Sequence, residues 1–122
     1  MKFYKCSHCG QIITKLNDKN IPVVCCGQIM QELIAGTTEA SLEKHIPVYK
    51  TENNIVTVAV GSVIHPMTED HYIQWVCLET NLGSQIKQLA PNTTPEVTFV
   101  IGNNEQIISV YAYCNLHNLW KA

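Results

Sequence analysis

Six cysteines and five histidines stand out among the 122 residues, because thiolate and imidazole groups are typical ligands of transition metals. Four cysteines lie near the start of the chain, as Cys6 and Cys9 in a Cys-x-x-Cys pattern and as the adjacent pair Cys25 and Cys26. Four thiolates suit tetrahedral zinc or iron, and ligand type alone does not distinguish these metals. The pattern therefore predicts a four-cysteine metal site, with His8 as a bystander inside the first turn.

The adjacent cysteines place a demand on the backbone. Neighbouring side chains in an extended segment point to opposite faces, so we expect a kink at Cys25 and Cys26 and a distorted angle at the metal. Gly10 and Gly27 follow the two cysteine pairs and give the backbone room to turn. A disulfide framework is the weaker interpretation, because the sequence shows no secretory signal. We therefore expect a cytoplasmic protein with reduced thiols.

A second set of candidate ligands is spread over the rest of the chain: His45, His65, His71, Cys114 and His117. We expect them in loops and at strand ends, where ligands are commonly held. Imidazoles with one thiolate suit a borderline transition metal. Five protein ligands would leave an octahedral ion one open position, which indicates catalysis. The alternative is that only three or four of them bind a structural zinc.

Composition excludes several classes of protein. Hydrophobic residues make up 46% and charged residues 15%, which is typical of a folded chain. Eight lysines, with no arginine, oppose ten acidic residues for a net charge of −2, which argues against nucleic-acid and membrane-surface binding. The apolar runs are far shorter than the roughly 20 residues that span a bilayer. We expect neither a nucleic-acid nor a membrane partner.

The elements that position these ligands are predicted to be β-strands. β-Branched and aromatic residues are concentrated in four short runs, the first of which also shows period-2 alternation, and no helical period extends over more than about a dozen residues. The predicted strands cover residues 54–60, 72–78, 97–101 and 107–113. Gly102-Asn103-Asn104 predicts a hairpin between the last two, and residues 89–95 hold two prolines that exclude a central strand. This pattern favours an antiparallel sandwich.

The two halves of the chain differ in composition. Residues 1–36 carry four lysines against two acids, and residues 37–122 carry four lysines against eight acids. Residues 35–41 are small or polar and without periodicity, as in a connector. We therefore predict two domains, 1–36 and 37–122.

The order of these motifs resembles the desulfoferrodoxin family, the two-iron class of superoxide reductases. The motifs that carry the resemblance are Cys6-Ser7-His8-Cys9, Cys25-Cys26-Gly27, Glu43-Lys44-His45-Ile46-Pro47, His65-Pro66-Met67 and Cys114-Asn115-Leu116-His117. The resemblance implies a mainly β fold, with a small desulforedoxin-like metal-binding domain followed by an immunoglobulin-like antiparallel β-sandwich. Asn118 departs from the family, which often has glycine there. Cys77 matches no family ligand and is expected to be buried.

The resemblance also implies two irons in each chain. One would be bound by Cys6, Cys9, Cys25 and Cys26. The other would have the imidazoles of His45, His65, His71 and His117 around a plane and the sulfur of Cys114 on the axis. The implied activity is one-electron reduction of superoxide to hydrogen peroxide, in oxygen detoxification. Lys44 would attract superoxide, and Glu43 would occupy the open position in the ferric state. A rubredoxin-like electron donor and a homodimer are implied in the same way.

Three other functions fit parts of the pattern. An electron carrier with two metal sites would have no open coordination position. A zinc-stabilised binding module would be colourless. A dismutase would release dioxygen as well as peroxide.

Overall fold

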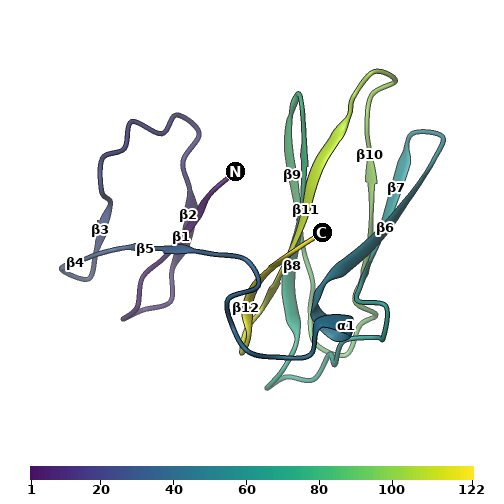
Figure 1. Ribbon diagram of the computed structural model, residues 1–122. Helices are drawn as coiled ribbons and strands as arrows, with labels where there is room; N and C mark the ends of the chain where they lie inside the picture. The colour runs from purple at the N-terminus through teal and green to yellow at the C-terminus, as the bar shows by residue number, and fades with distance from the viewer. The chain divides into compact units, whose positions relative to one another are not determined.

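Antiparallel β-strands form nearly all the regular structure of this chain, and the computed structural model describes all of residues 1–122. The chain divides into two units, residues 1–34 and 35–122. The strands of the first unit are β1 (Phe3–Lys5), β2 (Ile12–Thr14), β3 (Val24–Cys25), β4 (Gln28–Ile29) and β5 (Gln31–Leu33) (Figure 1). They form a three-stranded sheet in the order β2-β1-β5 and a separate β3–β4 hairpin.

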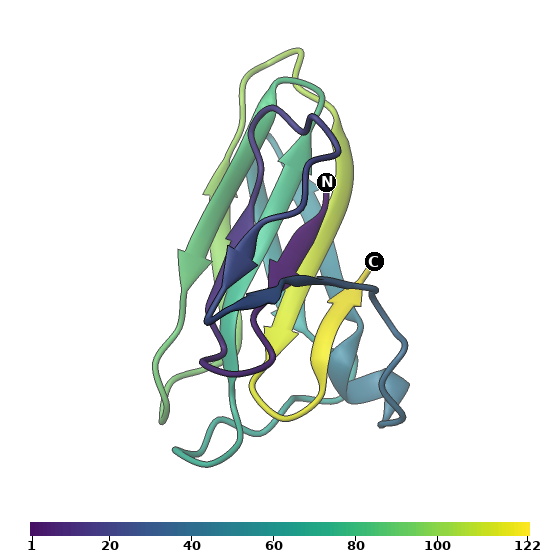
Figure 2. The same ribbon diagram turned by 90° about the vertical axis from the view of Figure 1, so that its left-hand side faces the viewer.

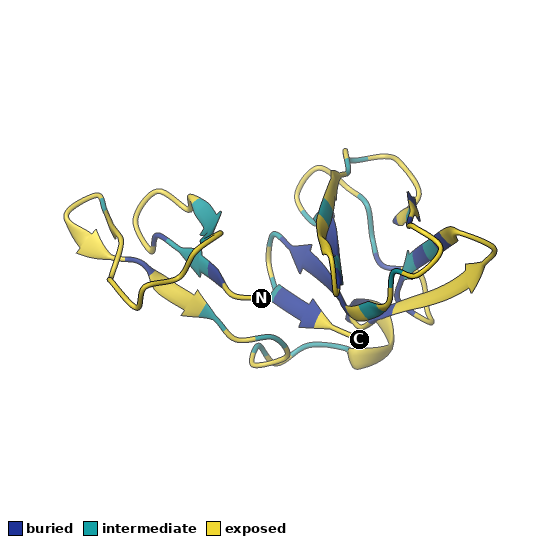
Figure 3. Ribbon diagram, turned by 90° about the horizontal axis from the view of Figure 1, so that it is seen from above, coloured by how far each residue is buried: buried dark blue, intermediate teal, exposed yellow.

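The first unit has a very small apolar core. Phe3, Cys6 and Met30 are its buried residues, and most of its ribbon in Figure 3 is exposed or intermediate. Folds of fewer than about 40 residues usually need a metal, disulfides or a partner for stability. None of the cysteines forms a disulfide. A bound metal or a partner chain would therefore help to stabilise this unit.

The second unit is a sandwich of two antiparallel sheets (Figures 1 and 2). One sheet has the order β10-β7-β6 and the other has the order β12-β11-β8-β9. The elements are α1 (Leu42–His45), β6 (Pro47–Glu52), β7 (Ile55–Val60), β8 (Ile73–Thr80), β9 (Gly83–Gln88), β10 (Glu96–Val100), β11 (Ile107–Cys114) and β12 (Asn118–Lys121). With only four residues, α1 is too short to span a membrane.

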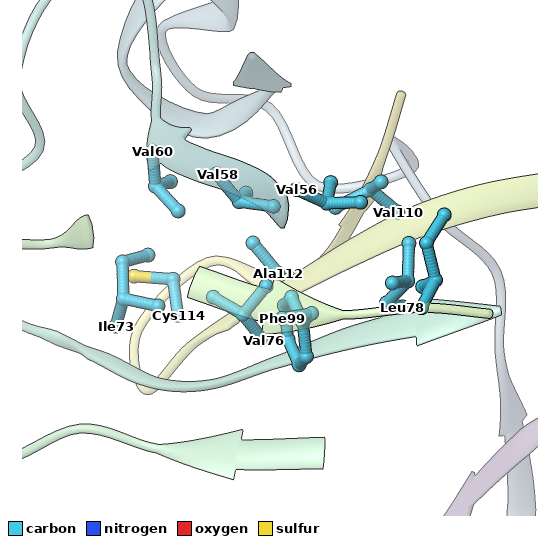
Figure 4. Close-up of a cluster of buried hydrophobic side chains, with 11 residues drawn as sticks. Val56, Val58, Val60, Ile73, Val76, Leu78, Phe99, Val110, Ala112 and Cys114 are labelled. Atoms are coloured by element: carbon cyan, nitrogen blue, oxygen red, sulfur yellow. The ribbon is translucent and has the colours of Figure 1, made fainter. Parts of the chain in front are cut away.

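The core between the sheets follows from alternation along the strands. In β7, Val56, Val58 and Val60 are buried, and the residues between them are partly exposed. Each fully buried valine contributes roughly 1.5–3 kcal/mol. Figure 4 shows Ile73 and Cys114 close together at the end of the core that Val60 marks. The apolar core thus extends to a residue that carries candidate metal chemistry.

The sequence-based prediction of a mainly β fold with antiparallel sheets is confirmed, but the predicted hairpin at residues 102–104 is wrong. β10 pairs with β7, whereas β11 pairs with β8 and β12, so the chain crosses from one sheet to the other at this turn. The Ile101 N–H donates to the Asn54 carbonyl, 2.9 Å away, which keeps the end of β10 on the first sheet. Turn residues indicate that the chain reverses direction. They do not specify whether the two flanking strands pair with each other or belong to different sheets.

Candidate metal centres

Two tight turns bring the four N-terminal cysteines together. Cys6 follows β1, and its carbonyl accepts a hydrogen bond from the Gly10 N–H at 3.0 Å, closing the turn that holds Cys9. Cys25 ends β3, and the two residues of the following hairpin turn, Cys26 and Gly27, have φ of 53° and 73°. Two consecutive positive φ values define a type I′ turn. This is the kink that the adjacent cysteines require.

The sulfur positions fit a tetrahedral ion. The four Sγ atoms all lie within 4.8 Å of one another, with Cys9 and Cys25 separated by 3.7 Å and Cys25 and Cys26 by 4.0 Å. A tetrahedral ion with metal–sulfur bonds of about 2.3 Å holds its sulfurs about 3.8 Å apart. The Cys9 N–H donates to the Cys6 sulfur at 3.5 Å, and backbone N–H groups lower the pKa of Cys6 to about 6. Hydrogen bonding among the neighbouring sulfurs raises the pKa of Cys25 to about 12. A cation would relieve this crowding of thiolates.

The second set of ligands comes from three separate segments at one end of the sandwich. His45 ends α1, His65 and His71 lie in the loop between β7 and β8, and Cys114 and His117 flank the turn from β11 to β12. The ligand atoms of His45, His65, His71 and Cys114 all lie within 4.8 Å of one another. His117 joins them through Nδ1, which lies 3.0 Å from His45 Nε2 and 3.8 Å from Cys114 Sγ.

The four imidazoles form a square. Rings that are neighbours around the square have centroids 4.6–5.0 Å apart and are nearly perpendicular, with interplanar angles of 79–84°. The diagonal from His45 to His71 is longer, at 6.3 Å. Four groups at the corners of a tetrahedron would all be equally far apart. The arrangement therefore suits an ion with four nitrogens in one plane.

The nitrogen separations lead to the same conclusion. His45 Nε2 lies 3.1 Å from His65 Nε2 and 3.0 Å from His117 Nδ1. Two nitrogens about 2.1 Å from one ion lie about 3.0 Å apart at a right angle and about 3.4 Å apart at a tetrahedral angle. These separations fit the square arrangement and disfavour a tetrahedral structural zinc.

Hydrogen bonds to backbone carbonyls fix two of the rings. His45 Nδ1 donates to the Ser41 carbonyl at 2.7 Å, and His65 Nδ1 donates to the Pro66 carbonyl at 2.6 Å. A carbonyl oxygen only accepts, so each Nδ1 carries the proton and each Nε2 keeps a lone pair for a metal. Burial lowers the pKa of His45 and lowers that of His65 to about 4, which keeps both rings neutral near pH 7.

An unpartnered nitrogen further indicates a cation at the centre of the square. The His71 Nε2 is buried and has no hydrogen-bond partner, a costly state for a polar atom unless a ligand satisfies it. Burial raises the pKa of the Cys114 thiol, and the Leu116 and His117 N–H groups oppose that effect. The same N–H groups would stabilise a thiolate bound to a metal.

Sequence reasoning did not single out Trp120, which contacts two of the candidate ligands. Its ring lies 4.8 Å from the His45 ring, and its Nε1 donates to the His117 carbonyl at 3.0 Å. A tryptophan in a four-residue strand carries no pattern that reveals such contacts. The side chains of Glu43 and Lys44 are exposed on α1, outside the cluster of ligand atoms. Cys77 is buried in β8, away from both clusters.

A β-sandwich with a histidine–cysteine site, joined to a small four-cysteine unit, defines a metalloprotein with two different metal-binding sites. The sequence profile described as desulfoferrodoxin matches residues 37–122, and that of the desulfoferrodoxin N-terminal domain matches residues 1–33. The chain belongs to the desulfoferrodoxin family.

Individual relatives agree with this assignment. The chain is 41% identical over 122 residues to a desulfoferrodoxin homolog of Archaeoglobus fulgidus, covering all of this chain and 96% of that protein. A superoxide reductase of Treponema pallidum has a similar structure, with 38% identity, a TM-score of 0.84, and coverage of 99% of this chain and 97% of that one. A one-iron superoxide reductase of Giardia intestinalis covers 66% of this chain and 95% of its own, with 32% identity and a TM-score of 0.56.

Proposed function

We propose that this chain is a superoxide reductase with two irons, and that residues 1–36 and 37–122 each hold one. The reaction adds one electron and two protons to superoxide and forms one hydrogen peroxide. The observation that carries the proposal is the square of four imidazoles with the Cys114 sulfur close to it. The superoxide reductases with similar structures support the same activity.

The burial of the candidate ligands supports an open coordination position for the substrate. Cys114 belongs to the apolar core, so its sulfur approaches the histidine square from the core side. His71 and His117 are partly exposed, which supports an open position on the opposite, outer face. A ferrous ion held by the five ligands would supply the electron, and the Cys114 thiolate would donate electron density to it.

Lys44 is the proposed attractor of superoxide. The chain has a net charge of −2, so its overall charge repels an anion and the attraction must be local. Lys44 is exposed and directly precedes His45 on α1. A unit charge pair about 4 Å apart at an effective dielectric near 20 interacts by about 4 kcal/mol, which sets the upper scale. The Nζ group would also hold the water that delivers protons. The Glu43 carboxylate would cap the open position after turnover.

The four-cysteine site has no vacancy, so its iron would transfer electrons or stabilise the first unit. A rubredoxin-like protein is the proposed electron donor, and the proposed assembly is a homodimer. Support for an assembly comes from apolar side chains exposed on a unit of only 34 residues, namely Leu16, Ile21, Val24 and Ile29. The proposed compartment is the cytoplasm, where a reducing environment keeps cysteines as thiols that can bind a metal.

The test is the stoichiometry of the purified protein with superoxide. A reductase supplied with excess reductant forms one peroxide for each superoxide and releases no dioxygen. A dismutase forms half as much peroxide and releases dioxygen, which would contradict the proposal. Metal analysis must find iron, since a colourless zinc protein would indicate a binding module. Azide must alter the spectrum of the histidine-site iron, because an electron carrier would offer azide no position.

A further inference from the structure

We propose that Asn115 is a positioning residue for the histidine–cysteine centre, and that it holds His71 in place through the backbone on both sides of that residue. The inference rests on the metal centre of the proposed function. It concerns a side chain that is not itself a candidate ligand.

His71 is held differently from His45 and His65. The His45 and His65 rings each donate from Nδ1 to a backbone carbonyl. The His71 Nε2 is buried without a partner, and no carbonyl fixes this ring in the same way. The direction of the His71 ring therefore depends on the backbone of its loop. A local turn, in which Thr68 and His71 exchange backbone hydrogen bonds of 3.0 and 3.2 Å, gives one constraint on that backbone.

Asn115 supplies the second constraint, from a distant part of the sequence. Its Oδ1 accepts from the Tyr72 N–H at 2.9 Å, and its Nδ2 donates to the Asp70 carbonyl at 2.9 Å. Its own N–H donates to the Tyr72 carbonyl at 3.2 Å. The oxygen and the nitrogen of the side-chain amide thus form hydrogen bonds with the residues immediately after and before His71.

The position of Asn115 in the sequence explains why these hydrogen bonds affect the metal centre. The residue follows Cys114 directly and lies two residues before His117. One side chain therefore ties the loop of one ligand to the turn that carries two others. Groups that orient ligands in this way commonly affect metal affinity by about 10- to 100-fold when they are removed.

The experiment measures ferrous iron affinity in the full chain, by competition with a chelator under anaerobic conditions. The Asn115→Ala variant should bind iron at the histidine site roughly 10- to 100-fold more weakly than the unaltered protein. Affinity at the four-cysteine site should stay unchanged, which gives an internal reference in the same sample. The charge-transfer band of the histidine-site iron should shift, since the His71 ring is free to turn.

Asn81→Ala is the matched control. The Asn81 side chain accepts from the Gln106 N–H at 2.8 Å, and its own N–H donates to the Gln106 carbonyl at 3.0 Å, in a turn that bears no candidate ligand. This variant loses a similar cross-chain hydrogen bond and should keep its iron. Equal iron loss in both variants, or an Asn115→Ala affinity within about twofold of the unaltered protein, would overturn the inference. Absence of iron from the unaltered histidine site would instead overturn the proposed function along with it.

Asn115→Asp keeps the proposal testable if the alanine variant does not fold. Aspartate has nearly the same shape and keeps the acceptor for the Tyr72 N–H, but it places an oxygen against the Asp70 carbonyl. Its added negative charge alone would strengthen the binding of a cation. Loss of the donor should instead weaken iron binding severalfold. A tighter histidine site in this variant would contradict the positioning role.

Discussion

Replacement of Gly61 by alanine should displace the helix that carries Glu43, Lys44 and His45. A Cβ atom at Gly61 would lie 2.3 Å from the Glu43 carbonyl oxygen and 2.8 Å from the Lys44 carbonyl carbon. The same carbonyl oxygen accepts from the Val63 N–H at 2.9 Å. The loop after β7 is therefore packed directly on the backbone of α1, with no space for a methyl group.

The size of the displacement follows from these distances. Ordinary contact begins near 3.4 Å, so the distance between the new Cβ and the Glu43 oxygen must grow from 2.3 to 3.4 Å, a shift of 1.1 Å shared between α1 and the loop. The obstacle is backbone, and no flexible side chain can yield in its place. Overpacking of this kind costs about 1–3 kcal/mol. Displacement of a reacting group by about 1 Å can lower a rate by about 100-fold, and His45 moves with α1.

Two measurements check the prediction. Thermal unfolding of Gly61→Ala should show a melting temperature at least about 4 °C lower, since 1 kcal/mol corresponds to about 4–8 °C in a domain of this size. Pulse radiolysis should show slower reaction with superoxide. The control is Gly102→Ala, whose Cβ would meet its nearest atom at an ordinary 3.5 Å, so both properties should change little. If Gly61→Ala matches that control in stability, spectrum and rate, α1 is not fixed by this contact.

Three further predictions concern charge and ligation. Lys44→Ala should slow the encounter with superoxide by about tenfold at low ionic strength and weaken its salt dependence, measured by pulse radiolysis; unchanged kinetics would reject the role. Cys114→Ser should abolish the thiolate-to-iron charge-transfer band. If the band remains, Cys114 is not the sulfur ligand of this iron. The Gly102 N–H, and then the Thr80 hydroxyl, lower the pKa of Glu105 from 4.5. Ionised Glu105 thus stabilises the fold above that pH and loses this effect as pH falls. Glu105→Gln should lower the melting temperature at pH 7 and have less effect near pH 3, so a constant difference would contradict this linkage.

The sequence predicted the buried strands better than the exposed ones. Residues 54–60 alternate clearly and residues 107–113 are rich in branched and aromatic residues, and the structure has β7 and β11 there. β6 and β9 were not predicted, because five of the six residues in each are exposed and their sequences carry little alternation. The local sequence pattern also could not predict that β10 pairs with β7, because a turn signal does not specify the partner strand.

The candidate ligands were visible in the sequence because their chemistry is carried by residue type. Cysteine and histidine are uncommon and bind metals wherever a fold gathers them, so spacing and type suffice to nominate them. Asn115, Trp120 and Gly61 act through contacts instead. Their effects depend on the Asp70 carbonyl, the His117 carbonyl and the backbone of α1, and no spacing rule brings these groups together before the fold is known.

The two metal sites differ in what the fold supplies before a metal arrives. The four cysteines occupy tight turns in a unit with three buried residues as its core, so the metal must supply much of the order there. The histidine square is mounted on a sandwich whose apolar core already includes Cys114, and carbonyl groups fix two of its rings. Preformed ligands do not have to be ordered at the moment of binding, and they keep their geometry when the coordination changes. The site with the more rigid support is thus the one that could keep an open position through a change of oxidation state, as the proposed function requires.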